Sequence, residues 1–262
     1  MNTDYMDYTD SLLRPPLPPP ARALLACYRR DARTQEGKLP LWEAWMSTES
    51  VFCRAVVKGG YLTEEQMLRA AERYRLGRSQ DGGVIFWQID EEGRTRDGKI
   101  MYYREDCHRD KSRHPSWASA RLKVYYGYDG DLPDDRCLFG LHLLGVVGGA
   151  VCVVEAEKTA VIMSEVYPQY IWMAAGGLSA LSAEKLRPLR DHKVVLFPDT
   201  DPDGTTYACW KAIAKEASRS FLSPIYVSPL LERHATPEQK AAKIDLVDFL
   251  FEPQITQISQ TI

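Results

Sequence analysis

The stretch KVVLFPDTDPDG, residues Lys193–Gly204, joins a continuous apolar run to three closely spaced aspartates, Asp199, Asp201 and Asp203. A short apolar run of this kind is typical of a parallel strand that is buried on both faces of a sheet. The aspartates therefore follow the carboxyl end of a predicted strand. Because open parallel sheets bind their ligands beyond those ends, the stretch predicts both the fold and the edge that carries its chemistry.

Strands and helices alternate on both sides of this stretch. Apolar runs predict strands at residues 151–154, 170–174, 193–197 and 224–228. Helical patterns between and after them predict helices near residues 157–166, 182–189, 205–219 and 245–250. This alternation favours an α/β fold with a mainly parallel sheet of about four strands, flanked by helices and joined by right-handed crossovers.

The chain before this alternation has a different pattern. Thr63 and Gln66 form a capping box that starts a helix, which Gly77 is expected to end. The runs GVIFWQID (residues 83–90) and GKIMYYRE (residues 98–105) are rich in β-branched and aromatic residues and are joined by a polar turn. They predict a β-hairpin, so a smaller α+β subdomain is expected in front of the parallel sheet.

These patterns divide the chain into parts. The run RPPLPPP favours an extended conformation, so residues 1–20 are expected to be a disordered, Pro-rich tail. The α+β subdomain is expected over residues 21–135, the α/β domain over residues 136–252 and a second tail over residues 253–262. The Gly/Asp-rich segment GYDGDLPDD marks the boundary near residue 135.

Composition argues against several classes of protein. The chain has no apolar run of the roughly 18 residues that a membrane helix needs. Its acidic, Pro-rich start is unlike a secretory signal, so a cytoplasmic protein with no membrane partner is expected. No C-x-x-C pair occurs, which does not support a zinc ribbon. The net charge of −3 conceals a basic stretch between Arg94 and Lys123, which either binds phosphates or forms a solvated hairpin.

The neighbouring predicted strands also end at residues that suit a ligand site. Glu155 follows the first strand, and Gly176 and Gly177 follow the second. Clustered carboxylates raise one another's pKa unless a cation lies between them, and hard oxygen ligands suit Mg²⁺ or Mn²⁺. The aspartate stretch alone could be a polar turn. Together with Glu155 it predicts a metal site that acts on phosphates.

The order of these elements resembles that of Toprim domains, which bacterial-type primases, topoisomerases and some nucleases share. VVEAEKTA, Val153–Ala160, is similar to the family's V-V-E-G-x-x-D-A motif, and FPDTDPDG is similar to its aspartate motif. The resemblance implies that Glu155 is the acid/base residue and a further metal ligand. It implies that Asp199 and Asp201 bind the metal, with Asp203 as a third ligand. KIDLVDFL, Lys243–Leu250, resembles the segment that closes many primase Toprim domains.

The resemblance extends upstream to the catalytic core of bacterial-type DNA primases. The predicted hairpin and CLFGLHLL, Cys137–Leu144, are similar to primase segments, so the likeness covers about residues 75–250 and points toward primase-like Toprim proteins of bacterial mobile elements. It implies that basic residues bind single-stranded nucleic acid and nucleotides. Lys99 and Arg104 match the family's hairpin best. The further binding candidates are Arg109, Lys111, Arg113, Lys123, Lys158, Gly176 and Gly177.

Two positions depart from the family pattern, since Ala156 replaces its glycine and Thr159 its later acid. The favoured expectation is primase-like, metal-dependent nucleotidyl transfer in replication or mobilisation of a mobile element. Its substrates would be nucleoside triphosphates and single-stranded DNA or RNA, and its partners a helicase or a separate zinc-binding module. Two alternatives stay open: a nuclease that uses the same acids, and a non-catalytic nucleic-acid-binding or assembly module.

Overall fold

The computed structural model describes residues 47–121, 136–145 and 148–251. Four features predicted from the sequence lie outside these residues: the tails at 1–20 and 253–262, the boundary near residue 135 and the candidate Lys123. None of the helices in the described residues is long and apolar enough to cross a membrane.

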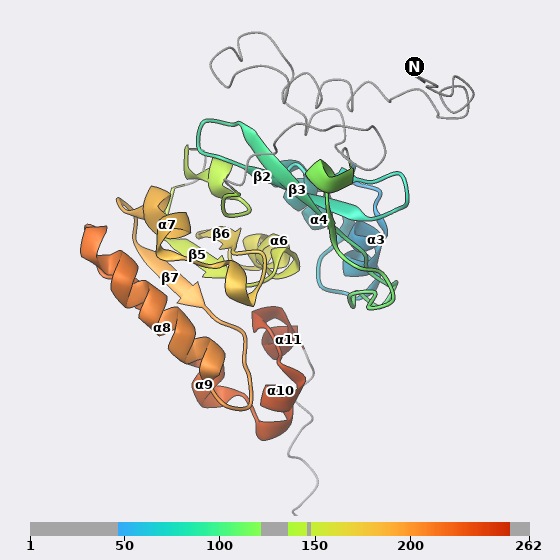
Figure 1. Cartoon of the computed structure of the whole chain (residues 1–262). Coiled ribbons are helices and arrows are strands. Elements are labelled where there is room, and N and C mark those ends of the chain that lie inside the picture. Colours follow the sequence, from blue (N-terminus) through green and yellow to red (C-terminus); the bar gives the residue numbers. More distant parts are fainter. Residues whose placement is uncertain (1–46, 122–135, 146–147, 252–262) are drawn as a thin grey trace, which may run out of the picture.

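Two four-stranded sheets form the framework, and Figure 1 shows them side by side. The first is antiparallel in the order β1-β2-β3-β4, with β1 at Gly77–Arg78, β2 at Val84–Ile89, β3 at Thr95–Met101 and β4 at Ser116–Trp117. The second is parallel in the order β6-β5-β7-β8, with β5 at Val151–Val154, β6 at Ile171–Ala174, β7 at Val194–Phe197 and β8 at Tyr226–Val227. The fold is therefore mixed α/β with one parallel sheet, as predicted.

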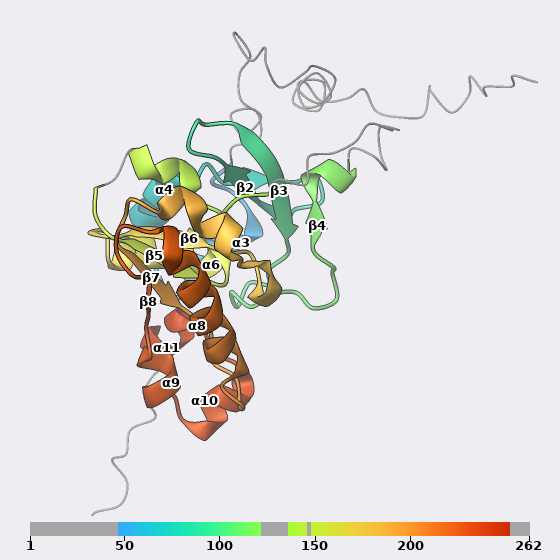
Figure 2. The same ribbon diagram turned by 60° about the vertical axis from the view of Figure 1, so that its left-hand side comes forward.

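Helices cover both sheets. Before the antiparallel sheet come α3 at Val51–Lys58 and α4 at Glu64–Arg73. Around the parallel sheet lie α6 at Glu157–Val166, α7 at Ala183–Leu186, α8 at Thr205–Ala217, α9 at Leu230–His234, α10 at Pro237–Ala242 and α11 at Leu246–Phe251. In Figure 1, α6 lies between the parallel sheet and α4, with α8 on the far side of the sheet. Figure 2 shows α8 to α11 together at the end of the molecule away from the antiparallel sheet.

The register of the parallel sheet aligns the carboxyl ends of β5, β6 and β7. Val154 of β5 pairs with Ala174 of β6 on one side and with Phe197 of β7 on the other. The residues that follow these strands therefore leave the sheet at one edge. All four strands are close to where the apolar runs predicted them, and β5 matches its prediction residue for residue.

The capping box predicted for α4 is present. The Thr63 hydroxyl accepts the Gln66 N–H, and the Gln66 side chain accepts the Thr63 N–H at 2.9 Å. The predicted end at Gly77 is wrong, because α4 stops at Arg73. Arg75 takes a left-handed conformation, φ 54°, which turns the chain into β1, where Gly77 pairs with Ile85.

The predicted hairpin also forms, but its second strand begins at Thr95 instead of Gly98. The Asp90 carboxylate explains the difference. It accepts the N–H groups of Glu92 and Arg94 and the guanidinium groups of Arg94 and Arg96. These contacts close a tight turn directly after β2, so residues expected in the turn join the ladder.

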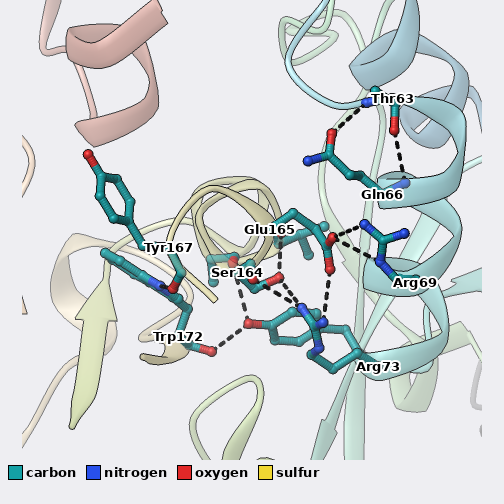
Figure 3. A network of polar contacts seen from close by, with 11 residues as sticks. Thr63, Gln66, Arg69, Arg73, Ser164, Glu165, Tyr167 and Trp172 are labelled. Atoms are coloured by element: carbon teal, nitrogen blue, oxygen red, sulfur yellow. Dashed lines mark hydrogen bonds and ion pairs between the residues drawn. The ribbon is translucent and has the colours of Figure 1, made fainter. Parts of the chain in front are cut away.

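A polar network ties α4 to α6, as Figure 3 shows. Arg69 and Arg73 both reach the Glu165 carboxylate at 2.9 Å. Arg73 also donates to the Ser164 hydroxyl, and the Tyr74 hydroxyl donates to the Trp172 carbonyl oxygen at 2.7 Å. The main hydrophobic cluster runs through α3, α4, β2 and the parallel sheet, so both sheets share one core.

Candidate functional site

The level ends of β5, β6 and β7 form the candidate site. Glu155 follows β5, Gly176 and Gly177 follow the residue after β6, and Asp199 lies just beyond β7. The Gly176 N–H donates to the Glu155 carbonyl oxygen at 3.0 Å, which joins the first two ends. Both glycines have positive φ, 92° and 145°, a conformation that side chains resist.

Asp199 is only partly exposed, and its carboxylate makes no hydrogen bond or ion pair with any described residue. Burial raises the pKa of Asp199 well above its ordinary value, and the charges of Asp245, Glu155 and Asp248 add to this. The Lys158 ammonium opposes them. Asp199 is thus an ionisable oxygen donor whose charge the protein leaves largely uncompensated.

Glu155 has a similar environment. Burial raises the pKa of Glu155 above its ordinary range, against the opposing effects of the Leu178 N–H and the Lys99 ammonium. The charges of Asp245 and Glu157 raise it further. Two carboxylates that resist ionisation therefore face the same edge of the sheet. A divalent cation between them would favour the charged form of both carboxylates and so oppose both shifts, which is why their chemistry fits such an ion.

Two further acids, Asp245 and Asp248, belong to this site, although the sequence did not mark them as candidates. They lie at the start of α11, where Asp248 donates its N–H to the Asp245 carboxylate at 2.8 Å and Asp245 returns the contact at 3.3 Å. Thr159 donates to the Asp245 carboxylate at 2.6 Å. The similarity of KIDLVDFL to a family segment was the one available signal.

Lys158 lies among these acids. Its ammonium is 3.5 Å from the Asp245 carboxylate and 3.4 Å from that of Asp248. Burial works against the charge of Lys158, yet Asp245 and Asp248 outweigh it and raise the pKa of the ammonium above its ordinary value. The expected role of Lys158 in binding nucleotide or nucleic acid stays a prediction, and in this structure its ammonium contacts the Asp245 and Asp248 carboxylates.

Lys99 reaches the same edge from the antiparallel sheet. Its ammonium donates to the Gly176 carbonyl oxygen at 2.7 Å and to the Glu157 carboxylate at 3.1 Å. The side chains are largely buried, with 13% of Lys99 and 2% of Glu157 exposed. One oxygen of Glu157 has no hydrogen-bond partner among the described residues. Lys99, predicted from the hairpin as a phosphate-binding residue, therefore lies at the sheet edge that carries Glu155 and Asp199.

Asp201 and Asp203 separate from Asp199. The Asp201 carboxylate accepts the N–H groups of Asp203, Thr205 and Thr206 at 2.6–3.0 Å, so it caps the start of α8. Burial opposes its charge, but the contacts from Thr206, Thr205 and Asp203 outweigh it and lower the pKa of Asp201 to about 2. Asp203 is exposed in the turn. The three aspartates predicted as metal ligands thus have different surroundings: Asp199 lies beside Glu155 at the sheet edge, Asp201 is engaged by backbone N–H groups, and Asp203 is exposed.

The other basic candidates are engaged elsewhere or exposed. Arg104 pairs with Asp106 at 2.7 Å on the surface. Arg113 pairs with Asp81 and stacks on the Tyr102 ring at 3.5 Å. Arg109 and Lys111 are exposed to solvent.

Two carboxylates of the protein are available to bind a metal ion at this edge, with water or substrate oxygens completing its coordination. No set of three or more His, Cys, Asp or Glu side chains is arranged to hold a metal within the described ranges. Glu155 and Asp199 offer two carboxylates. Mg²⁺ is commonly held by one or two carboxylates and completes its shell with water and substrate phosphates, so the pair is sufficient for such an ion.

Comparisons with known proteins find one matching family model and several solved structures of low sequence identity. A family model described as Domain of unknown function (DUF6371) matches residues 52–200. No curated protein matches the chain.

The similar solved structures include three primase fragments. The RNA polymerase domain of Mycobacterium tuberculosis primase DnaG is 15% identical with a TM-score of 0.46, over 87% of this chain and 85% of that one. The primase fragment of the bacteriophage T7 primase-helicase is 17% identical with a TM-score of 0.44, over 78% and 74%. The Aquifex aeolicus primase fragment, with zinc-binding and RNA polymerase domains, is 16% identical with a TM-score of 0.39, over 79% and 53%. Likeness at this level carries no argument about activity, which has to be judged from the side chains themselves.

Proposed function

Since the chain belongs to the DUF6371 family, whose description assigns no activity, we propose a function from its own side chains: primase-like, metal-dependent nucleotidyl transfer by a Toprim-type domain. The substrates would be nucleoside triphosphates and single-stranded DNA or RNA. The reaction would serve replication or mobilisation of a mobile element, with a helicase or a zinc-binding module as possible partners.

One observation carries the proposal. Glu155 and Asp199 follow the paired ends of β5 and β7 and both have raised pKa values, and Lys99 reaches the same edge from another sheet. Carboxylates for a divalent ion beside an ammonium for phosphate are the groups that phosphoryl chemistry requires.

Each residue then has a role. Glu155 and Asp199 would hold Mg²⁺ or Mn²⁺, and Glu155 could also accept the proton of an attacking hydroxyl. When bound there, the ion supplies positive charge to the reacting phosphate and orients the attacking oxygen. Lys99 would neutralise charge on the triphosphate or template, and Gly176 and Gly177 leave room for a ligand to approach the backbone.

The two departures from the Toprim motif are compatible with this function. Ala156 has φ −99°, a conformation open to any residue, so the family's glycine is not needed for the backbone. The Thr159 hydroxyl donates a hydrogen bond to the Asp245 carboxylate. Thr159 therefore holds an acid of the site in place, although it carries no carboxylate itself. Neither departure therefore removes a group that the proposed reaction uses.

The test is incorporation of labelled nucleotide on single-stranded DNA and RNA, with Mg²⁺ or Mn²⁺. Asp199→Asn is expected to lower the rate by on the order of 100-fold or more, because a ligand to the ion is lost. Asp191→Asn is the matched control. Asp191 is an exposed acid ahead of β7, at the opposite end of that strand from Asp199, and it should leave the rate unchanged.

The same assay separates the alternatives. Products that need triphosphates support the proposal, whereas strands shortened without triphosphates would establish a nuclease that uses the same acids. A wild-type protein that binds single strands, but leaves every substrate unchanged with either metal, would establish the non-catalytic module.

A further inference from the structure

The acids of the site fall into two pairs with different surroundings. Asp245 and Asp248 are engaged within the fold. Each gives one oxygen to the other's N–H, the second oxygen of Asp245 accepts Thr159, and the second oxygen of each faces Lys158. Each of the four carboxylate oxygens of this pair thus already has at least one contact within the fold, and one oxygen of each residue faces the Lys158 ammonium.

The charge of this pair is also partly balanced from within. Lys158 has only 15% of its side chain exposed, and Asp245 has 8%. Its ammonium lies within 3.5 Å of one carboxylate and 3.4 Å of the other. A charge held this close and largely out of water interacts strongly with both acids. Lys158 is the second residue of α6, so the helix holds its backbone in place.

Glu155 and Asp199 form the contrasting pair. No ammonium or guanidinium forms an ion pair with either carboxylate among the described residues. The Lys99 ammonium opposes the pKa shift of Glu155 and the Lys158 ammonium that of Asp199. The contacts of Lys99 go to Glu157 and the Gly176 carbonyl oxygen, and those of Lys158 go to Asp245 and Asp248. This pair therefore lacks a cation, while the Asp245–Asp248 pair has one.

We propose that Lys158 is the resident cation of the Asp245–Asp248 pair, so that the chain takes up one divalent ion, at Glu155 and Asp199, and not two. This inference rests on the proposed function. Many phosphoryl-transfer sites hold two metal ions roughly 4 Å apart. Here a covalently attached ammonium supplies the positive charge at the second acidic pair, and a second divalent ion there would be repelled by it.

The consequence is that the positive charge at the Asp245–Asp248 pair comes from a side chain and not from a metal ion that can dissociate. An ammonium keeps its position without depending on the metal concentration, but it offers no coordination sites to a substrate oxygen. The Lys158 ammonium therefore balances the charge of the two acids, but it cannot coordinate a substrate oxygen as a second metal ion would. Lys158 acts through the acids, so it is a positioning residue and not a catalytic one.

The test is direct counting of bound Mn²⁺ on the full chain by electron paramagnetic resonance of the free ion, without nucleotide. Wild type is expected to bind one ion per chain. Lys158→Met should bind two, because the second acidic pair then lacks its cation. Lys158→Arg should stay at one, and so should Lys215→Met, which removes an exposed lysine of α8.

A second set of variants decides the question even if Lys158→Met does not fold. Asp199→Asn should abolish binding of the single ion, whereas Asp245→Asn should leave it bound. Loss of the ion in Asp245→Asn instead, or one ion in both wild type and a folded Lys158→Met, would overturn the inference.

The failure of this inference can be told from failure of the proposed function. Two ions on wild type would overturn the role of Lys158 and leave metal-dependent transfer intact. No bound ion on wild type would overturn the metal-dependent function, and this inference with it.

Discussion

Lys99, in the middle of the antiparallel sheet, donates its ammonium to the carbonyl oxygen of Gly176 beyond the parallel strand β6, at 2.7 Å. The same ammonium meets Glu157, at the start of α6. A single side chain thus connects the two sheets at the edge where the carboxylates gather. Its position allows a role in the chemistry and a role in stability, and the two can be separated.

Lys99→Met is expected to destabilise the protein by about 3 kcal/mol and to lower nucleotide incorporation. The loss of stability follows because Glu157 would be left as a buried, unpaired carboxylate. Urea unfolding measures the free energy, and the labelled-nucleotide assay measures the rate.

The double variant Lys99→Met/Glu157→Gln separates the two roles. It removes the unpaired Glu157 carboxylate, so most of the free energy of unfolding should return. The rate of nucleotide incorporation should stay low, because Lys99 is still absent. Recovery of the rate together with the stability would mean that Lys99 serves the fold alone.

Asp199→Asn should make the metal-free protein more stable by about 1 kcal/mol. The substitution removes a carboxylate that burial and three neighbouring acids disfavour in its charged form. Mn²⁺ should raise the melting temperature of wild type and have no effect on the variant. A variant that is less stable than wild type without metal would show that Asp199 has a structural partner.

Asp201→Ala should destabilise the protein by about 1–2 kcal/mol, because two N–H groups at the start of α8 and one in the turn before it lose their acceptor. Asp203→Ala, two positions away and exposed, is the matched control and should change little. The lowered pKa sets the pH range: the contribution of Asp201 is complete above the ordinary value of about 4 and is lost as the pH falls toward 2. Equal costs for the two variants would contradict the capping role.

His142 should make the fold sensitive to mild acid. Burial lowers the pKa of His142 to about 4, against a hydrogen bond to the Arg73 carbonyl oxygen. The unfolded chain takes up the proton near pH 6.5 and the folded chain only near 4. Stability due to this residue is therefore present above pH 6.5 and is lost as the pH falls, by about 3 kcal/mol in all.

Urea midpoints of wild type and His142→Gln, measured from pH 7.5 to 4.5, check this expectation. The glutamine amide can keep the hydrogen bond to Arg73 but does not titrate. Its midpoint should fall less steeply than that of wild type, and parallel curves would rule out the histidine as the cause.

Much of the fold could be predicted from local patterns. The capping box of Thr63 and Gln66 and the apolar run of β5 each depend on adjacent residues, and both were predicted correctly. Helix α10 was missed, although Thr236 and Gln239 form the same kind of capping box with Pro237 at the first position. Its six residues carry no buried side chain, so the hydrophobic periodicity that predicted α6 and α8 is absent there.

The site was predictable only in part. Glu155 and Asp199 follow apolar strands, and strand ends can be read from sequence. Asp199 and Asp201 look equivalent in D-x-D spacing, and their separation depends on the backbone turn into α8, which directs Asp201 to three N–H groups. The pairing of Lys158 with Asp245 joins residues far apart in the chain, and such contacts leave no local pattern.

The contacts between α4 and α6 limit how this domain can be divided or recombined. Glu165, on α6, is balanced by Arg69 and Arg73, which precede the parallel sheet by many residues. A fragment that starts at residue 136 would keep the carboxylate and lose both arginines, and it would expose the apolar side of α6. The parallel sheet and its helices are therefore not expected to fold as an independent unit without α4. Any gene rearrangement that moves it into a new protein must carry α4 along, or supply a substitute for that helix.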